Sequence, residues 1–375
     1  MRAVFYAPLK PPGHRVPSGD RRLARLLLRA IAKSGNAVSV ASRMRAFDGS
    51  GDTARQNRIR RRGAALARRY IEQHRHDPPD LWFTYHLYHK APDWIGPVVA
   101  DAFSIPYVVA EASMSPKQAE GPWRMGHDAV ADAIRRADRV IVLNPADRAC
   151  LEPLVRRRDI LVDLAPFIDT AKPRRAADRR ARERARLSAL HGVAQSDIWI
   201  AVTAMMRPGD KLDSYRLLGQ AMPRLAGLAL HWLVAGDGPA RSDVARALGA
   251  SRITYLGALD RVEIDALHAA ADLAVWPALR EAFGMALLEA QAAGLPVVAG
   301  ASPGVARIVA DGQTGLLTPA GDDRMLANAI RKLAIDPQRR RQMGHAAMQK
   351  AEQQHDIGAA ATLIGRVLLD ARAAT

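Results

Sequence analysis

The chain has 375 residues, 49% of them hydrophobic, and a formal net charge of +17 at neutral pH. Its single cysteine, Cys150, excludes internal disulfides and cysteine metal clusters, and no apolar run approaches the ~20 residues of a membrane span. The charge favours an anionic partner, either a phosphorylated substrate or an acidic membrane face. Nucleic acid is not expected as a partner, because only 5% of the residues are aromatic and no stacking motif accompanies the basic segments.

The first part of the chain alternates short apolar runs with helical stretches. Arg2–Ala7 predicts a first strand rather than a signal peptide, and a loop rich in Pro and Gly leads to a helix over Arg21–Ser34. Further strands are expected at Val38–Val40, Asp80–Thr84, Pro106–Ala110 and Arg139–Leu143. This alternation predicts one doubly wound α/β sheet.

The second part repeats the same alternation after a strand at Ile160–Leu164. A charged helical connector is expected over Lys172–Leu190, and a polar helical tail over Gln338–Ala374. The strands expected between them are Asp197–Thr203, Leu228–Ala235, Ile253–Leu256, Leu273–Trp276 and Pro296–Ala299. A length of 375 residues accommodates two such domains.

Residues 277–294 carry the most informative pattern, two glutamates eight positions apart. Glu281 lies in a loop, and Glu289 lies in a helix that begins near Met285 and ends before Gly294. The free N–H groups at Phe283, Gly284 and Met285 form the positive end of this helix and favour an anion. Carboxylates on both sides fit a phosphate flanked by hydroxyl-rich groups, as in a nucleotide-sugar.

This segment resembles the retaining GT-B glycosyltransferases, in particular glycosyltransferase family 4, the group 1 glycosyl transferases. The shared pattern is Glu-x7-Glu with Phe-Gly inside it and Glu-Ala-x-Ala-x-Gly at its end, here from Glu281 to Gly294. The resemblance implies an α/β fold of the GT-B type, with two Rossmann-like doubly wound domains facing a central cleft. It also implies that Glu289 binds the ribose hydroxyls and that Glu281 contacts the transferred sugar. An ordinary βαβ unit with two surface glutamates is the alternative.

Two cations follow the strand expected at Asp197–Thr203. Arg207 and Lys211 flank a Pro-Gly turn, and a planar fork next to a point charge suits a diphosphate. The family carries an Arg and a Lys on this loop, but Leu212 stands where many members have Gly. By the same resemblance Gly236 shapes the donor site, for which a plain turn is an equal alternative. The resemblance also implies that the base lies near the backbone of Leu256.

The first domain offers a weaker set of candidates. Gly19 stands before the first helix, where the family places a Gly-rich loop against the diphosphate and acceptor. His86 follows one strand, at an edge where the family has a histidine, and may equally be a surface-loop residue in this chain. Glu111 ends the next strand, where many members have a histidine beside the reacting sugar. Its carboxylate could stabilise oxocarbenium charge or accept the acceptor's proton, and the alternative is a structural ion pair.

Three basic clusters account for much of the net charge. Seven arginines with no acid lie in residues 55–69, a second cluster runs from Lys172 to Arg186, and the third is Arg339–Arg341. Solvated helix faces explain such runs in general, and we expect this for the third. For the first cluster a membrane-surface or acceptor-binding role is an equal alternative.

Together these observations predict a retaining, metal-independent glycosyltransferase that transfers a sugar from a nucleoside-diphosphate sugar to a carbohydrate or glycolipid acceptor. The expected catalytic residues are Glu111, Arg207, Lys211 and Glu281, with no metal and no cofactor. We expect an acceptor-side domain over 1–168, a connector over 169–190, a donor domain over 191–356, and a last helix over 357–375 that returns to the first domain. Bacterial envelope synthesis is expected from the family. The single cysteine and the lack of an apolar span suit a cytoplasmic protein, and the basic cluster of residues 55–69 suggests a peripheral contact with the inner membrane face. An inactive nucleotide-sugar-binding or scaffold protein and a nucleotide-sugar epimerase are the alternatives.

Overall fold

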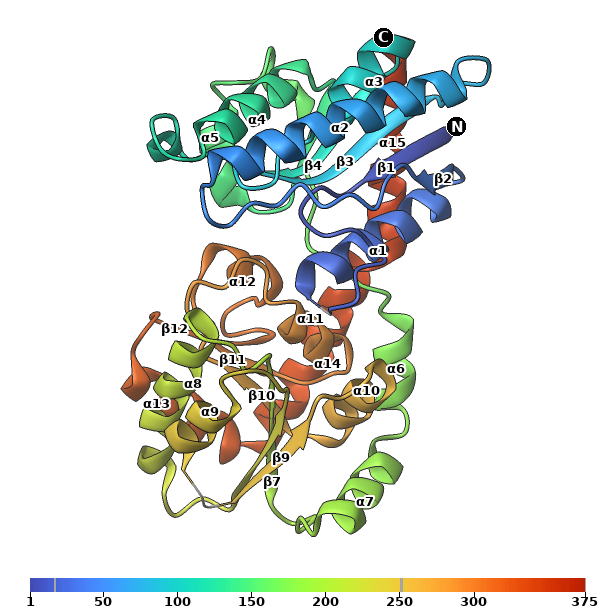
Figure 1. The fold of residues 1–375 in the computed structure, drawn as a ribbon. Coiled ribbons are helices and arrows are strands. Elements are labelled where there is room, and N and C mark those ends of the chain that lie inside the picture. Colours follow the sequence, from blue (N-terminus) through green and yellow to red (C-terminus); the bar gives the residue numbers. More distant parts are fainter. Residues whose placement is uncertain (17, 250–251, 375) are drawn as a thin grey trace. The chain divides into compact units, whose positions relative to one another are not determined.

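The computed structural model describes residues 1–16, 18–249 and 252–374, which form two compact units (Figure 1). The first unit contains Met1–Ala165 and the segment from Ile357 onward, and the second contains Pro166–Asp356. The last helix therefore belongs to the same unit as the N-terminal sheet, although nearly 200 residues separate them in the sequence.

A six-stranded parallel sheet forms the centre of the first unit. Its strand order is β2-β1-β3-β4-β5-β6, so the order reverses between β1 and β3. Ligands of such sheets bind beyond the carboxyl ends of the strands at the point of reversal. The strands are β1 (Arg2–Tyr6), β2 (Ala37–Val40), β3 (Leu81–Leu87), β4 (Tyr107–Ala112), β5 (Arg139–Val142) and β6 (Leu161–Asp163).

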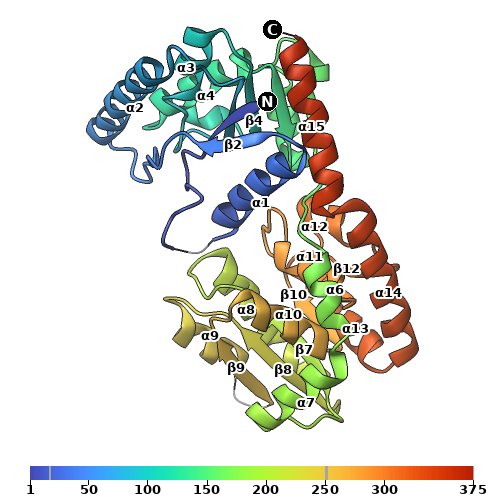
Figure 2. The ribbon, with the colours of Figure 1, turned by 90° about the vertical axis from the view of Figure 1, so that its right-hand side faces the viewer.

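Helices cover both faces of this sheet. On one face α3 and α4 pack against β4 and α2 packs on α3; on the other, α15 packs against α1 and β4 (Figure 2). The helices are α1 (Gly19–Lys33), α2 (Thr53–His74), α3 (Gly96–Phe103), α4 (Arg124–Arg136), α5 (Arg148–Leu151) and α15 (Ile357–Ala373). Covering both faces is the reason that the strands read as apolar runs rather than as alternating patterns.

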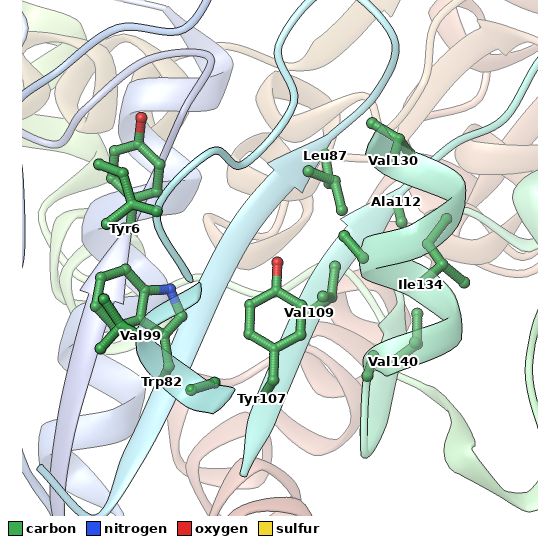
Figure 3. Packing of buried hydrophobic residues seen from close by; sticks show 14 of the residues in the cluster. Tyr6, Trp82, Leu87, Val99, Tyr107, Val109, Ala112, Val130, Ile134 and Val140 are labelled. Carbon is green, nitrogen blue, oxygen red and sulfur yellow. The ribbon is translucent and has the colours of Figure 1, made fainter. Parts of the chain in front are cut away.

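The core beneath α3 and α4 is built from large side chains of neighbouring strands (Figure 3). Trp82 and Tyr107 are fully buried and lie on adjacent strands. Val99 of α3 lies by Trp82, and Ile134 of α4 lies on the other side of the same cluster, near Val140. Both polar side-chain atoms have partners: Trp82 Nε1 donates to the Thr84 hydroxyl at 3.0 Å, and the Tyr107 hydroxyl donates to Asp93 at 3.1 Å. The Asp93 carboxylate also accepts from the backbone at the start of α3. Buried aromatic side chains with a polar group need such partners.

The second unit contains another six-stranded parallel sheet, ordered β12-β11-β10-β7-β8-β9. Read from the first strand of the unit, this is the doubly wound order of dinucleotide-binding domains, and it reverses between β7 and β10. The strands are β7 (Ile198–Thr203), β8 (Leu230–Ala235), β9 (Ile253–Gly257), β10 (Leu273–Trp276), β11 (Val297–Gly300) and β12 (Gly315–Thr318). The helices are α6 (Ala171–Ala177), α7 (Arg180–His191), α8 (Asp210–Ala221), α9 (Arg241–Leu248), α10 (Arg261–Ala270), α11 (Met285–Ala292), α12 (Pro303–Ile308), α13 (Asp323–Ala334) and α14 (Pro337–Gln354).

The predicted connector over 172–190 consists of two helices, α6 and α7, and both pack against α10 within the second unit. Arg184 donates to the carbonyl of Ala270 at 2.8 Å and pairs with Asp272 at 3.0 Å, and its guanidinium lies 4.3 Å from the Trp199 ring centroid. Arg180 also pairs with Asp272. Part of the second basic cluster therefore caps the end of α10, where cations complement the helix dipole.

The predicted elements agree with the structure in most places and differ at a few strand ends. β10 has the predicted bounds, whereas β12 was not predicted, because a four-residue segment that begins with Gly315 carries little periodicity. The expectation that His86 follows its strand was wrong at the boundary, since β3 extends through it, and β4 extends one residue beyond Glu111. Both residues have a positive φ, which sequence patterns do not reveal.

Candidate functional site

The loop after β7 carries the two predicted diphosphate cations. Gly209, with φ of 81°, ends the loop, and Lys211 lies in the first turn of α8. Arg207 is exposed, and among the residues that the structure describes it pairs with no carboxylate. An unpaired guanidinium at a strand's carboxyl end can accept an anionic ligand without first breaking an ion pair.

Two glycines of the loop after β8, Gly236 and Gly238, pack closely against the backbone of the Arg207 loop. A Cβ on Gly236 would lie 1.8 Å from the carbonyl oxygen of Ala204, and a Cβ on Gly238 would lie 2.3 Å from that of Met206. Met206 also donates its N–H to the carbonyl of Asp237 at 3.0 Å. The Gly-x-Gly pattern thus allows close backbone contact between two loops, a packing role that the sequence did not distinguish from ligand contact.

Glu281 lies in the loop after β10 and faces the Arg207 loop across the point of strand reversal. Its carboxylate pairs with the Lys211 ammonium group and accepts a hydrogen bond from Trp276 Nε1 at 3.2 Å. Ala278 and Arg280, on the same loop, have φ of 55° and 50°. Left-handed backbone at non-glycine residues costs roughly 1–3 kcal/mol each and is common at functional sites.

These two loops enclose a pocket of about 220 Å³. Its lining is Arg207, Pro208, Asp210, Lys211, Leu279, Arg280 and Glu281. Arg280 also pairs with Asp210 at 2.5 Å and with Asp213 at 3.3 Å. The pocket therefore combines three cations with two carboxylates, those of Asp210 and Glu281, and each carboxylate pairs with a cation of the lining. Cations suited to a diphosphate next to carboxylates that can accept from hydroxyl groups are compatible with a nucleotide-sugar.

The start of α12 packs against the backbone of the Glu281 loop and holds it in place. The Ser302 hydroxyl caps α12 and donates to the carbonyl of Glu281 at 3.0 Å. A Cβ on Gly304 would lie 1.7 Å from the carbonyl oxygen of Ala282, so this contact also requires glycine. The position of Glu281 is consequently set by packing as well as by its ion pair.

The helix that begins beyond this loop follows the prediction. Gly284 adopts φ of 68° at the N-cap, and α11 starts at Met285 without a side-chain cap. Its first N–H groups therefore have no partner within the helix and provide hydrogen-bond donors for an anion near Phe283.

Glu289 lies on α11 with its side chain only 2% exposed, so it is more deeply buried than a ligand-contacting group usually is. Its carboxylate is 2.8 Å from Arg261 Nη1, and Arg261 Nη2 is 2.7 Å from Asp265. Arg261 starts α10, directly after the β9 edge where Leu256 is half-buried. The ion pair fixes the orientation of the Glu289 carboxylate. It also gives a structural reason for the burial of Glu289, in addition to the predicted role in ribose binding.

The predicted residues of the first unit meet at the carboxyl ends of β3 and β4. Gly19 opens α1 after the Ser18 cap, and no atom lies within 4 Å of a Cβ placed on it. His86 Nδ1 lies 3.7 Å from Glu111 Oε1 and 3.4 Å from Asp20 Oδ1. Burial raises the pKa of Glu111, and the nearby His86 charge offsets only part of this effect.

Several residues of these sites were not predicted, among them Arg280 and Asp210 of the pocket and the glutamate partners Arg261 and Trp276. Arg280 could have been found as a third cation next to Glu281. Arg261 and Trp276 contact the two glutamates only through the tertiary structure, and no local pattern indicates this. Within the described residues no cluster of three or more His, Cys, Asp or Glu side chains is suited to a metal ion, and no helix there is long and apolar enough to cross a membrane.

Comparisons with known proteins show similarity to glycosyltransferases. Residues 213–350 match the family model described as "Glycosyl transferases group 1". The D-inositol 3-phosphate glycosyltransferase of Corynebacterium aurimucosum is 41% identical over 130 residues, which are 34% of this chain and 31% of that protein. The chain thus spans about a third of the length of this curated relative.

Two solved structures match nearly the whole chain at low identity. Sucrose-phosphate synthase from Thermosynechococcus elongatus has a TM-score of 0.73 at 20% identity, with 100% of both chains covered. Anabaena HepE in complex with UDP has a TM-score of 0.74 at 19% identity, with 98% of this chain and 100% of that chain covered. The predicted GT-B fold class is confirmed by these matches.

Proposed function

We propose that this protein is a retaining glycosyltransferase of family 4 that uses a nucleoside-diphosphate sugar as donor. The observation that carries the proposal is the pocket between the β7 and β10 loops, where Arg207, Lys211 and Glu281 come together at the point of strand reversal. The pocket lies at the edge of the sheet where doubly wound domains bind nucleotides. The HepE structure contains UDP, which supports a nucleotide ligand for the same fold.

In this proposal the side chains divide the donor between them. Arg207 and Lys211 hold the diphosphate, together with the amides at the start of α11, and Glu289 holds the ribose. Glu281 contacts the transferred sugar and is kept in place by Trp276. Fixed cations and dipoles stabilise the negative charge that develops on the leaving diphosphate, since they need no reorganisation during bond breaking.

The acceptor is proposed to be a carbohydrate or glycolipid, bound at the carboxyl edge of the first sheet near Gly19, His86 and Glu111. An acidic membrane surface is proposed as a peripheral contact for α2. The arginines of α2 within residues 55–69 are exposed, and Arg55 alone pairs with a carboxylate among the residues that the structure describes, Asp48 at 3.7 Å. A role in bacterial envelope polysaccharide or glycoconjugate synthesis would be consistent with both features.

A thermal-shift panel tests the donor assignment directly. UDP-glucose, UDP-N-acetylglucosamine, GDP-mannose and ADP-glucose should be compared with the matching nucleoside monophosphates and sugar 1-phosphates. One of the sugar nucleotides should raise the melting temperature in proportion to the logarithm of its concentration, and Arg207→Ala should reduce the shift. A flat response to every sugar nucleotide would refute the donor proposal.

Turnover then separates the proposed activity from its alternatives. Slow donor hydrolysis without an acceptor indicates a transferase, because water replaces the missing acceptor. Binding without turnover would indicate an inactive scaffold, and a new sugar within an intact nucleotide-sugar would indicate an epimerase. EDTA should leave the turnover intact if Arg207 and Lys211 replace a metal ion, whereas Arg207→Ala should lower it by roughly 10²–10³-fold.

A further inference from the structure

His86 and Glu111, near the carboxyl ends of β3 and β4, lie close to Asp20 of α1, and Asp147 beyond β5 acts on both electrostatically. Of these four titratable side chains only His86 can carry a positive charge. His86 Nδ1 lies between two carboxylates, 3.4 Å from Asp20 and 3.7 Å from Glu111. The Glu111 side chain is 10% exposed and that of His86 is 19% exposed. A charge at these distances and this burial strongly affects the ionisation of its neighbours.

The backbone of the cluster is strained at the two central residues. His86 has φ of 63° and Glu111 has φ of 58°, although both stand in adjacent parallel strands. Histidine is among the non-glycine residues that adopt a left-handed backbone more readily, whereas glutamate is not, so the strain is clearest at Glu111. Strain persists where surrounding structure enforces it, and here it lies at the strand ends beside the point of strand reversal.

The buried polar atoms of His86 and Glu111 do not have all the hydrogen-bond partners that they can accommodate. Oε2 of Glu111 is buried and has no hydrogen-bond partner among the residues that the structure describes, and His86 Nδ1 faces only the two carboxylates, at 3.4 and 3.7 Å. A buried polar atom without a partner is costly in a purely structural ion pair. Glu111 therefore retains hydrogen-bonding capacity that a bound hydroxyl group can use.

We propose that His86 is a positioning residue, whose imidazolium group keeps the buried Glu111 carboxylate ionised and whose own charge is held by Asp20. This inference deepens the proposed transferase function and rests on it for its catalytic meaning. Both roles considered for Glu111, acceptance of a proton and stabilisation of an oxocarbenium ion, require the carboxylate form. The ion pair itself is a property of the free protein and can be measured without any substrate.

The directions of ionisation agree with this geometry. Burial alone would lower the pKa of His86, but the Glu111 and Asp20 carboxylates outweigh burial, and the net effect is a raised pKa. Burial raises the pKa of Glu111, and His86 is the largest influence that lowers it. Asp147 and Tyr85 also face the pair, and burial raises the pKa of Asp147 to about 6.

The test is an NMR titration of the His86 ring in the full chain without ligand. The His86 resonance is identified by its loss in His86→Asn, since asparagine tolerates the left-handed backbone. The wild-type ring should titrate above its ordinary range, and Glu111→Gln should lower its midpoint by one to three pH units. The exposed ring of His345, on α14, serves as the internal control and should not move.

Enzyme kinetics provide the second readout. If donor hydrolysis requires ionised Glu111, His86→Asn should move the acid limb of its pH profile upward by one to three pH units, because Glu111 has lost its cation. A His86 midpoint that stays the same in Glu111→Gln would overturn the inference even in an active transferase. Absence of donor turnover, together with a large shift of the midpoint, would instead refute the proposed function and leave the ion pair established.

Discussion

Replacement of Glu289 tests the donor site at its most buried group. In the structure its carboxylate is 2.8 Å from Arg261 and almost inaccessible, so truncation to alanine would combine a lost ligand contact with a broken ion pair. Glu289→Gln is the sharper change, because it preserves size and removes only the charge. If the carboxylate binds the ribose, its hydrogen bonds to the two hydroxyls contribute about 1.5–3 kcal/mol. The affinity for the nucleotide should then fall about 10- to 150-fold.

Isothermal titration with UDP, GDP and ADP, and with their 2′-deoxy analogues, separates ribose contact from structural damage. For the wild-type protein the deoxy analogue of the preferred nucleotide should bind more weakly. In Glu289→Gln the two forms should bind nearly alike, because the group that distinguishes them is gone. Arg261→Met is the matched control, since it removes the partner of Glu289 and retains the carboxylate. Unchanged affinity in a folded Glu289→Gln, or equal losses for both nucleotide forms, would refute the ribose assignment.

Three further predictions concern other parts of the molecule. Gly236→Ala should lower the free energy of unfolding by roughly 2–6 kcal/mol, because the new Cβ combines a positive φ with a backbone clash. Gly227→Ala is the control: it has a positive φ but open space, so it should cost only ~1–2 kcal/mol. Equal losses for the two variants in chemical unfolding would contradict this. Burial, and to a lesser extent the Lys350 charge, lowers the pKa of His355 to about 4 in the folded protein. Neutral His355 therefore contributes fully to the stability of the folded state above pH 6.5, and this contribution is lost as the pH falls towards 4. The unfolding free energy should decrease by about 3 kcal/mol more in the wild type than in His355→Gln over this range, and parallel pH curves would argue against it. Binding of α2 to vesicles should require acidic lipid, decrease with salt and weaken when Arg60–Arg62 become Gln; equal binding to neutral vesicles would leave only a solvated helix face.

Local sequence signals were sufficient for much of the second unit. The run of helix formers after Gly284 predicted the start of α11, and the apolar run at Leu273–Trp276 predicted β10, since both signals lie within a few residues. β12 was missed because four residues are too few to show a period. The same limit explains why the boundaries of short strands were less accurate than the presence of the strands.

The candidate sites were predicted residue by residue but not as interacting groups. Glu281 and Lys211 were assigned to different parts of a ligand, and the structure shows that they form an ion pair with each other. The Glu289–Arg261 pair joins residues 28 positions apart, and only the packing of α10 beside α11 brings them together. Contacts of this kind depend on the tertiary arrangement of helices, on which a single sequence carries little information.

The arginines of the three basic clusters have different roles in the folded protein, although the sequence segments are similar in composition. Arg184 serves as a cap for α10 and stacks on Trp199, and Arg340 donates to the last carbonyls of α13, including that of Ala334 at 2.6 Å. The arginines of α2 within residues 55–69 remain exposed. The net charge of +17 therefore contains a structural part and a solvent-facing part, and only the second is available for an anionic surface.

The anomeric configuration of the sugar released during donor hydrolysis tests the central claim most directly. A sugar nucleotide that raises the melting temperature, such as UDP-glucose, should be followed by proton NMR in the first minutes, before the free sugar equilibrates. The account predicts that an α-linked donor releases the α-anomer first, and that Glu281→Ala abolishes the release while the protein stays folded. Release of the β-anomer first, or no release from any sugar nucleotide that binds, would contradict a retaining transferase.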